Sequence, residues 1–299
     1  MVAKRLVVAA LAALFSACAN QAQPNADGAL LVVATTSIVG DIARNVVGEE
    51  RTVEVLIPIG VDAHDFAPSA QQASLIAGAD LVVATGLGLE QRLEDVLASA
   101  AADGVPVVEL GPMVDPIPFS DGNGEVDPHF WMDPIRVGTA ARALAAELGE
   151  RVPGGAWEEN AAAYADEMAE ADIEISRLLD QVPEGSRKMV TNHEAFGYFA
   201  NRYGFEIIGV VIPGGSTLAE PSSAELTALV ETMRTEGVSV IFAETSLPTR
   251  LAEAIAADVG EEVHLVELFT ESLGPSGSGA DTLVTMLVTN AERVASSLG

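Results

Sequence analysis

Histidine is scarce in this sequence of 299 residues, and three of the four histidines stand where a loop meets a predicted strand or helix. His64 and His193 follow predicted strands, and His129 comes just before a helix that we expect to begin at Pro134. In open α/β sheets, ligands bind outside the carboxyl ends of the strands. We therefore expect the three histidines to face one crevice.

Neutral imidazole is the usual zinc ligand, and a carboxylate oxygen can complete the tetrahedron that zinc prefers. Asp281, which ends a glycine-rich segment before the last predicted helix, is the first candidate for this fourth ligand. Glu244, at the end of a predicted strand, is the alternative. His264 lies inside a predicted strand, and we interpret it as structural. The predicted metal site is therefore His64, His129, His193 and Asp281, with Glu244 as the alternative fourth ligand.

The first 18 residues have the pattern of a signal peptide, in which two basic residues precede an apolar run that is too short for an ordinary transmembrane helix. Cys18 is the only cysteine, so no intrachain disulfide can form. The segment LFSAC (14–18) resembles a bacterial lipobox, which predicts an exported protein anchored to the membrane by a lipid on Cys18. A plain cleaved signal peptide is the alternative. Residues 19–29 would then form a flexible tether.

The formal net charge of −29 predicts a polyanionic surface. Such a surface repels nucleic acid, which excludes nucleic-acid binding as a function. Hydrophobic residues make up 49% of the chain and aromatic residues only 5%. This composition is typical of an α/β core built mainly from Ala, Val, Leu and Ile.

Short apolar runs alternate with amphipathic segments in both halves of the chain, which is typical of parallel sheets with crossover helices. We expect two similar α/β lobes, at residues 30–152 and 184–299, with the metal site between them. The predicted strands are Leu30–Ala34, Val53–Pro58, Leu81–Thr85, Val105–Leu110, Met189–Asn192, Ile207–Val211, Val238–Ala243 and Val263–Leu268.

Residues 153–183 separate the two halves and have a helical pattern. Between Trp157 and Val182, apolar residues recur at alternating steps of four and three, which places them on one face of a helix roughly 40 Å long. A coiled-coil dimer is the competing interpretation, but alanines fill much of the stripe. We therefore expect a monomer in which one long, rigid helix joins the lobes.

Each of the four candidate ligands lies in a distinctive sequence motif. The most specific is DPHFWMDP (127–134) around His129, and TNHEAFGYFA (191–200) surrounds His193. These motifs resemble those of the zinc and manganese receptors of ABC importers. The resemblance covers nearly the whole mature chain, and its remaining segments are 33–42, 56–69, 79–90 and 280–282.

The resemblance implies a receptor that binds a metal ion and delivers it to an ABC permease with its ATPase. Family members that resemble zinc receptors tend to have His at the third ligand position, and those that resemble manganese receptors tend to have Glu. His193 therefore favours Zn²⁺ as the transported ion, and a manganese-specific receptor for Mn²⁺ is the alternative. The segment 120–126 is short and has no histidine, unlike the His-rich loop of many zinc receptors.

Other functions explain the sequence less well. A secreted zinc hydrolase needs an open coordination position and a general base, whereas four protein ligands close the site, so we do not expect an enzyme. The loop Pro213-Gly214-Gly215-Ser216-Thr217 could cradle an anion, but no lysine follows, and we interpret it as a turn beside the lobe interface. A metal-binding adhesin is a third possible class of function.

Overall fold

The computed structural model describes residues 30–48, 51–119, 124–260 and 262–299. Cys18, the predicted signal peptide and the tether lie outside these residues. In the described part of the chain, no helix has the length and apolar character needed to span a bilayer.

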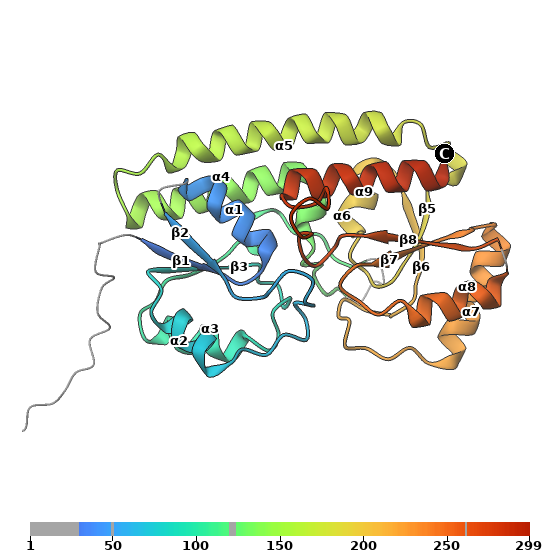
Figure 1. Cartoon of the computed structure of the whole chain (residues 1–299), viewed down its shortest axis with the longest axis horizontal. Coiled ribbons are helices and arrows are strands. Elements are labelled where there is room, and N and C mark those ends of the chain that lie inside the picture. The colour runs from blue at the N-terminus through green and yellow to red at the C-terminus, as the bar shows by residue number, and fades with distance from the viewer. Residues whose placement is uncertain (1–29, 49–50, 120–123, 261) are drawn as a thin grey trace, which may run out of the picture.

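The N-terminal lobe contains a sheet of four parallel strands in the order β2-β1-β3-β4. Its two central strands share the apolar sequence LVVA and are almost completely buried, because helices cover both faces of the sheet. Helices α1 and α4 lie on one face, and α2 and α3 on the other (Figure 1). The elements are β1 Leu31–Ala34, α1 Ser37–Val47, β2 Thr52–Val55, α2 Ala70–Ala77, β3 Leu81–Ala84, α3 Glu94–Ala102, β4 Val107–Glu109 and α4 Pro134–Arg151.

The C-terminal lobe repeats this arrangement, because its four parallel strands follow the equivalent order β6-β5-β7-β8. The prediction of two similar parallel-sheet lobes is therefore confirmed. The elements are β5 Lys188–Thr191, α6 Gly197–Tyr203, β6 Glu206–Val210, α7 Ser223–Glu236, β7 Val240–Glu244, α8 Arg250–Val259, β8 His264–Leu268 and α9 Leu283–Leu298.

The long helix α5, Trp157–Leu179, runs along both lobes and packs against α1, α4 and α9 (Figure 1). Its predicted apolar stripe is buried in these contacts, which leaves little of it for a coiled-coil partner. The hydroxyl of Tyr164 donates a 2.6 Å hydrogen bond to the Asp41 carboxylate of α1. The prediction of one long helix joining the lobes is confirmed.

Local signals set where helices of both lobes begin and end. Asp133 caps α4 by accepting a 2.9 Å hydrogen bond from the backbone N–H of Ile135, and Pro134 occupies the first helical position. Ser222 and Glu225 form the predicted capping box of α7. Gly237 ends that helix with φ of 65°, a conformation that favours glycine.

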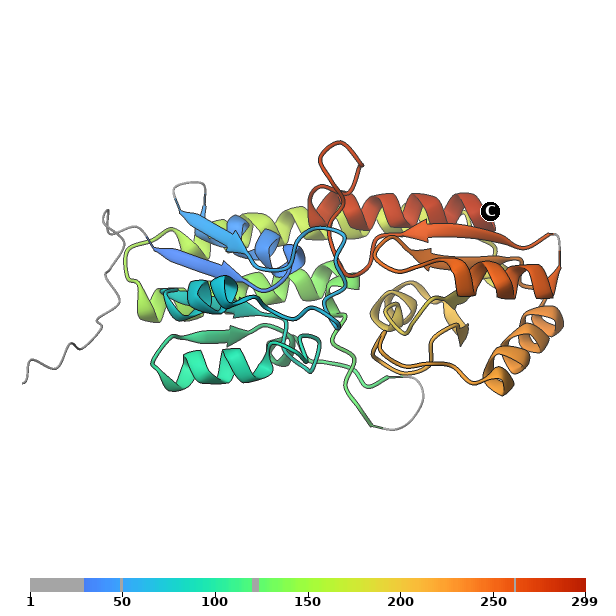
Figure 2. The same cartoon turned by 60° about the horizontal axis from the view of Figure 1, so that its bottom comes forward.

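The strands of the two sheets run toward one another, as the blue strand β1 and the orange strand β8 show in Figure 2. The carboxyl ends of both sheets therefore face the middle of the molecule. Loops that follow strands of either lobe meet there, which brings together residues far apart in the sequence.

Candidate metal site

Three histidines and one glutamate gather between the lobes: one ligand atom from each of them lies within 4.8 Å of the other three. His64 is on the loop after β2, and His129 directly precedes a 3₁₀ turn, Phe130–Met132, that leads into α4. His193 follows β5, and Glu271 follows β8. The three histidine side chains are 0% exposed and Glu271 is 2% exposed, so solvent does not reach the group.

The spacing within the group suits a tetrahedral metal ion. Nε2 of His129 lies 3.2 Å from Nε2 of His193 and 3.1 Å from Oε1 of Glu271. Nε2 of His193 is 3.4 Å from the same oxygen, and Nε2 of His64 is 3.9 Å from Oε2. A tetrahedron with metal–ligand distances of about 2.0–2.1 Å has edges of about 3.3–3.4 Å. Among the described residues, Nε2 of His64 and both Glu271 oxygens lack a hydrogen-bond partner, as expected of metal ligands.

Two carboxylates orient the rings of His129 and His193. Asp127 Oδ1 lies 2.7 Å from Nδ1 of His129 and also accepts a hydrogen bond from the backbone N–H of His129. Glu244 Oε1 makes the same pair of contacts with Nδ1 and the backbone N–H of His193. A carboxylate on Nδ1 keeps the proton there and leaves the Nε2 lone pair free for a metal.

The loop that carries Glu271 is held from the opposite lobe. Trp131 Nε1 donates a 2.8 Å hydrogen bond to the carbonyl of Thr270. The backbone N–H of Leu273 donates one of 2.9 Å to the hydroxyl of Ser37. Two residues of the N-terminal lobe thus flank Glu271, so the position of this carboxylate depends on how the lobes meet.

The structure does not bring Asp281 to the histidines. Asp281 is exposed, because the backbone N–H of Gly274 bonds the carbonyl of Ala280 and closes the intervening loop on itself. Asp281 then lies beyond this loop, next to Thr282, which caps α9. Glu244 is buried but contacts the far side of the His193 ring. His264, interpreted as structural, is exposed at the start of β8.

Glu271 is not among the ligands predicted from the sequence, although the sequence contains a signal that selects it. Glu271 follows the strand predicted at Val263–Leu268, just as His193 follows the strand predicted at Met189–Asn192. The rule that ligands lie beyond the carboxyl ends of strands selects both residues equally.

The buried charges shift the pKa values of the group strongly. Burial lowers the pKa of His64 to about 4. Burial also acts against the charged form of His129, but the nearby Glu271 and Asp127 carboxylates outweigh it and raise the pKa of His129 to about 9. Burial likewise opposes ionisation of His193, yet Glu244 and Glu271 raise its pKa. In Glu271, the surrounding histidines overcome burial and hold the pKa well below its usual range.

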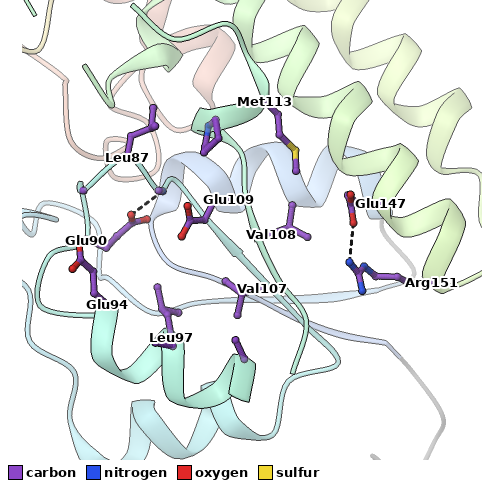
Figure 3. Close-up of a pocket in the computed structure, with 15 residues that line it drawn as sticks. Leu87, Glu90, Glu94, Leu97, Val107, Val108, Glu109, Met113, Glu147 and Arg151 are labelled. Atoms are coloured by element: carbon purple, nitrogen blue, oxygen red, sulfur yellow. Dashed lines mark hydrogen bonds and ion pairs between the residues drawn. The ribbon is translucent and has the colours of Figure 1, made fainter. Parts of the chain in front are cut away.

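A separate cavity in the N-terminal lobe is not part of this group. It has a volume of about 650 Å³ and lies between α3, β4 and α4 (Figure 3). Glu90 at its edge accepts hydrogen bonds from Thr35 and from the backbone N–H groups of Thr85 and Gly86, so its carboxylate is already engaged. None of the four clustered residues lines the cavity.

Comparison with known proteins identifies the family. Residues 32–297 match the family described as the periplasmic component A of the zinc-uptake complex. The chain belongs to this family. The match extends over both lobes and α5, and the recognition made from the sequence motifs is confirmed.

Individual relatives cover nearly the full chain. The manganese-binding lipoprotein MntA of Halalkalibacterium halodurans is 29% identical, over 98% of this chain and 97% of its own length. The metal ABC transporter substrate-binding lipoprotein SsaB of Streptococcus sanguinis is 27% identical, over 98% of this chain and 97% of its own length. The zinc-binding protein TroA of Treponema pallidum is 30% identical, over 91% of this chain and 90% of its own length. The solved structure of TroA superposes with a TM-score of 0.84 at 27% identity, and the superposition covers 91% of this chain and 100% of that chain.

Membership in this family makes the chain a substrate-binding component of a metal ABC importer rather than an enzyme, as the sequence predicts. Its relatives include both zinc-binding and manganese-binding proteins. Family membership alone therefore leaves the choice of ion to the chemistry of the four clustered side chains.

Proposed function

We propose that this protein captures Zn²⁺ with His64, His129, His193 and Glu271 and delivers it to an ABC importer. The observation that carries the proposal is the buried group of three imidazole nitrogens and one carboxylate at tetrahedral spacing. Glu271 takes the place that the sequence argument gave to Asp281. The two carboxylates behind His129 and His193 support the proposal, because metal-ligating histidines usually donate their other N–H to such a group.

The donor set favours zinc over manganese. Three neutral imidazoles and one carboxylate match the ligands and the coordination number of zinc, whereas manganese prefers more oxygen ligands. Zinc also binds a given nitrogen and oxygen site more tightly than manganese does. His193 supplies one of the three nitrogen ligands. A glutamate at this position would supply an oxygen instead, which would suit manganese better.

A manganese receptor is the second candidate, and the orientation of Glu271 is the observation that favours it. Oε1 of Glu271 faces His129 and His193, while Oε2 faces His64. A carboxylate in this position can bind through both oxygens and provide a fifth ligand. The name of the relative MntA agrees with this alternative.

Metal titrations distinguish the two candidates. We expect the wild-type chain to bind one Zn²⁺ and to prefer it over Mn²⁺ by at least about 100-fold, following the usual order of divalent-metal affinities. His193→Glu should narrow this preference, because it replaces a nitrogen by a carboxylate oxygen. His264→Glu is the matched control, since His264 is exposed and outside the group. Competition with chelators of known affinity measures both constants. Tighter binding of manganese by the wild type would favour the second candidate, and binding of neither ion would refute both.

Delivery requires partners and a location outside the cytoplasm. We propose that a cognate permease with its ATPase receives the ion, and that the chain acts as a monomer held at the membrane by a lipid on Cys18. The names of relatives such as SsaB, a lipoprotein of a metal ABC transporter, support this arrangement. Labelling with a radioactive fatty acid tests the anchor, because Cys18→Ala should abolish the incorporated label.

Zinc affinity should fall as the pH is lowered, because protonated imidazole has no lone pair to donate. The pKa of His129 is raised to about 9, so in the metal-free protein this ring holds a proton at neutral pH that zinc must displace. Each proton released weakens binding by up to about tenfold per pH unit below that value. His64, with a pKa of about 4, adds nothing near neutrality. Chelator competition between about pH 6 and 8, the range in which histidine ordinarily titrates, measures the slope, and an affinity independent of pH would contradict the expectation.

A further inference from the structure

The described residues bury the proposed site. All four ligands are buried, and α4, α5 and α9 with their apolar core close one side of the lobe interface. The loops that follow β2 and β6 lie on the side away from α5 (Figure 1). Entry and release therefore require movement, and these loops can move without disturbing the helices.

The loop Pro213–Thr217 after β6 contacts the N-terminal half of the chain at two points. Thr217 Oγ1 donates a 2.6 Å hydrogen bond to Asp62 Oδ2. At Gly215, an added Cβ would lie 2.1 Å from the ring of Phe119, so only glycine allows this close packing. The Phe119 ring in turn stands edge-on to the ring of His129, with centroids 6.4 Å apart. The loop thus covers the side of the site that carries His129.

Asp62 links this loop to a metal ligand. Its Oδ1 accepts a 2.9 Å hydrogen bond from the backbone N–H of His64, while its Oδ2 accepts the one from Thr217. One carboxylate therefore joins the position of His64 in the N-terminal lobe to the loop of the C-terminal lobe. Thr217 itself is adjacent to none of the four ligands in the sequence and is only half-buried.

A cavity leads from solvent to the same loop. It has a volume of about 420 Å³, and Gly88 and Gln91 of the N-terminal lobe line it together with Phe119, Gly215 and Ser216. Phe119 thus lines this cavity and also contacts the ring of His129. Gly214, with φ of 88°, lies next to Gly215, and this pair of glycines gives the loop backbone freedom that other residues lack.

We propose that the loop Pro213–Thr217 is a lid through which the ion enters and leaves, and that the hydrogen bond from Thr217 to Asp62 is its latch. The inference rests on the proposed metal function and extends it, because it names the segment that controls exchange. Thr217 and Asp62 are positioning residues, since neither is one of the four clustered residues. Loss of the latch favours the open lid and therefore speeds release of the bound ion.

Stopped-flow release of zinc tests the latch. The zinc-loaded full chain is mixed with a chromogenic chelator, at concentrations where the rate no longer depends on the chelator. Thr217→Val keeps the shape of the side chain but lacks the hydroxyl. We expect this variant to release zinc about tenfold faster, which corresponds to destabilising the closed lid by about 1.4 kcal/mol. Thr217→Ser retains a hydroxyl and should restore release to near the wild-type rate.

Thr235→Val is the matched control, because the Thr235 hydroxyl donates its hydrogen bond to the carbonyl of Glu231 within the exposed face of α7, away from the loop Pro213–Thr217. It should leave the rate unchanged. Stoichiometric zinc binding by Thr217→Val with release at the wild-type rate would overturn the lid proposal and leave the metal function intact. Equal acceleration by Thr235→Val would also overturn it. Failure of the wild type to bind zinc would refute the metal function and this inference together.

Discussion

Glu271→Gln should lower zinc affinity by at least about 100-fold, while Asp281→Asn should leave it unchanged. Replacing a residue that only supports a metal ligand lowers metal affinity by about 10- to 100-fold, so removing the charge of a ligand should lower it at least as much. The two substitutions make the same chemical change, from carboxylate to amide. Only Glu271 lies among the histidines, with Oε1 3.1 Å from Nε2 of His129, whereas Asp281 is exposed.

Chelator competition measures the affinities, and circular dichroism of the metal-free proteins checks that both variants fold. In the Glu271→Gln variant the amide has nearly the volume of the original carboxylate, so any loss of affinity reports the change of ligand rather than a cavity. The opposite result, in which Asp281→Asn loses zinc and Glu271→Gln keeps it, would restore the ligand set expected from the sequence and contradict the proposed one.

Zinc should raise the unfolding temperature of the wild-type chain by roughly 8–16 °C at a free concentration of about 1,000 times its Kd. At that concentration, a ligand that binds only the folded state adds about 4.1 kcal/mol to the free energy of unfolding. For a chain of this size, each kcal/mol corresponds to a shift of roughly 2–4 °C. The four ligands come from positions 64, 129, 193 and 271, so the unfolded chain has no preformed site.

Thermal unfolding followed by circular dichroism, with zinc or with EDTA, measures this shift. Asp281→Asn should show the same shift as the wild type, and Glu271→Gln should show little of it at the same zinc concentration. Wild-type protein that binds zinc stoichiometrically but unfolds at the same temperature with and without the ion would argue against a site that joins the two lobes.

Most of the architecture could be predicted from periodicity and end signals. The eight predicted strands match β1 to β8 to within a few residues at each end. The central strands β1, β3, β5 and β7 are mostly buried, and such strands form apolar runs that are easily found in the sequence. The predicted long helix begins at Trp157 and ends at Leu179, a few residues inside the expected range 153–183. Asp133 and Ser222 cap helices as expected, because capping depends on neighbours only a few residues away.

The fourth member of the site was more difficult to predict, because it depends on where a loop turns. Asp281 and Glu271 both follow the last strand, and the rule that selects Glu271 does not by itself exclude Asp281. The contact between Gly274 and Ala280 directs the intervening loop away from the interface. Hydrogen bonds to Trp131 and Ser37, which lie in the other lobe, hold Glu271 against the histidines.

Short-range patterns in the sequence were enough to determine the two parallel-sheet lobes, the long helix between them, and the three histidines that follow strands or precede a helix. In such patterns each residue's role depends on its neighbours in the chain. The pairing of β5 with β7 inside the C-terminal lobe places Glu244 behind His193. The packing of the lobes brings Glu271 and the histidines together and lets Thr217 bond Asp62 across the interface. Each of these depends on contacts between segments far apart in the chain, which form only when the strands pair and the lobes pack together.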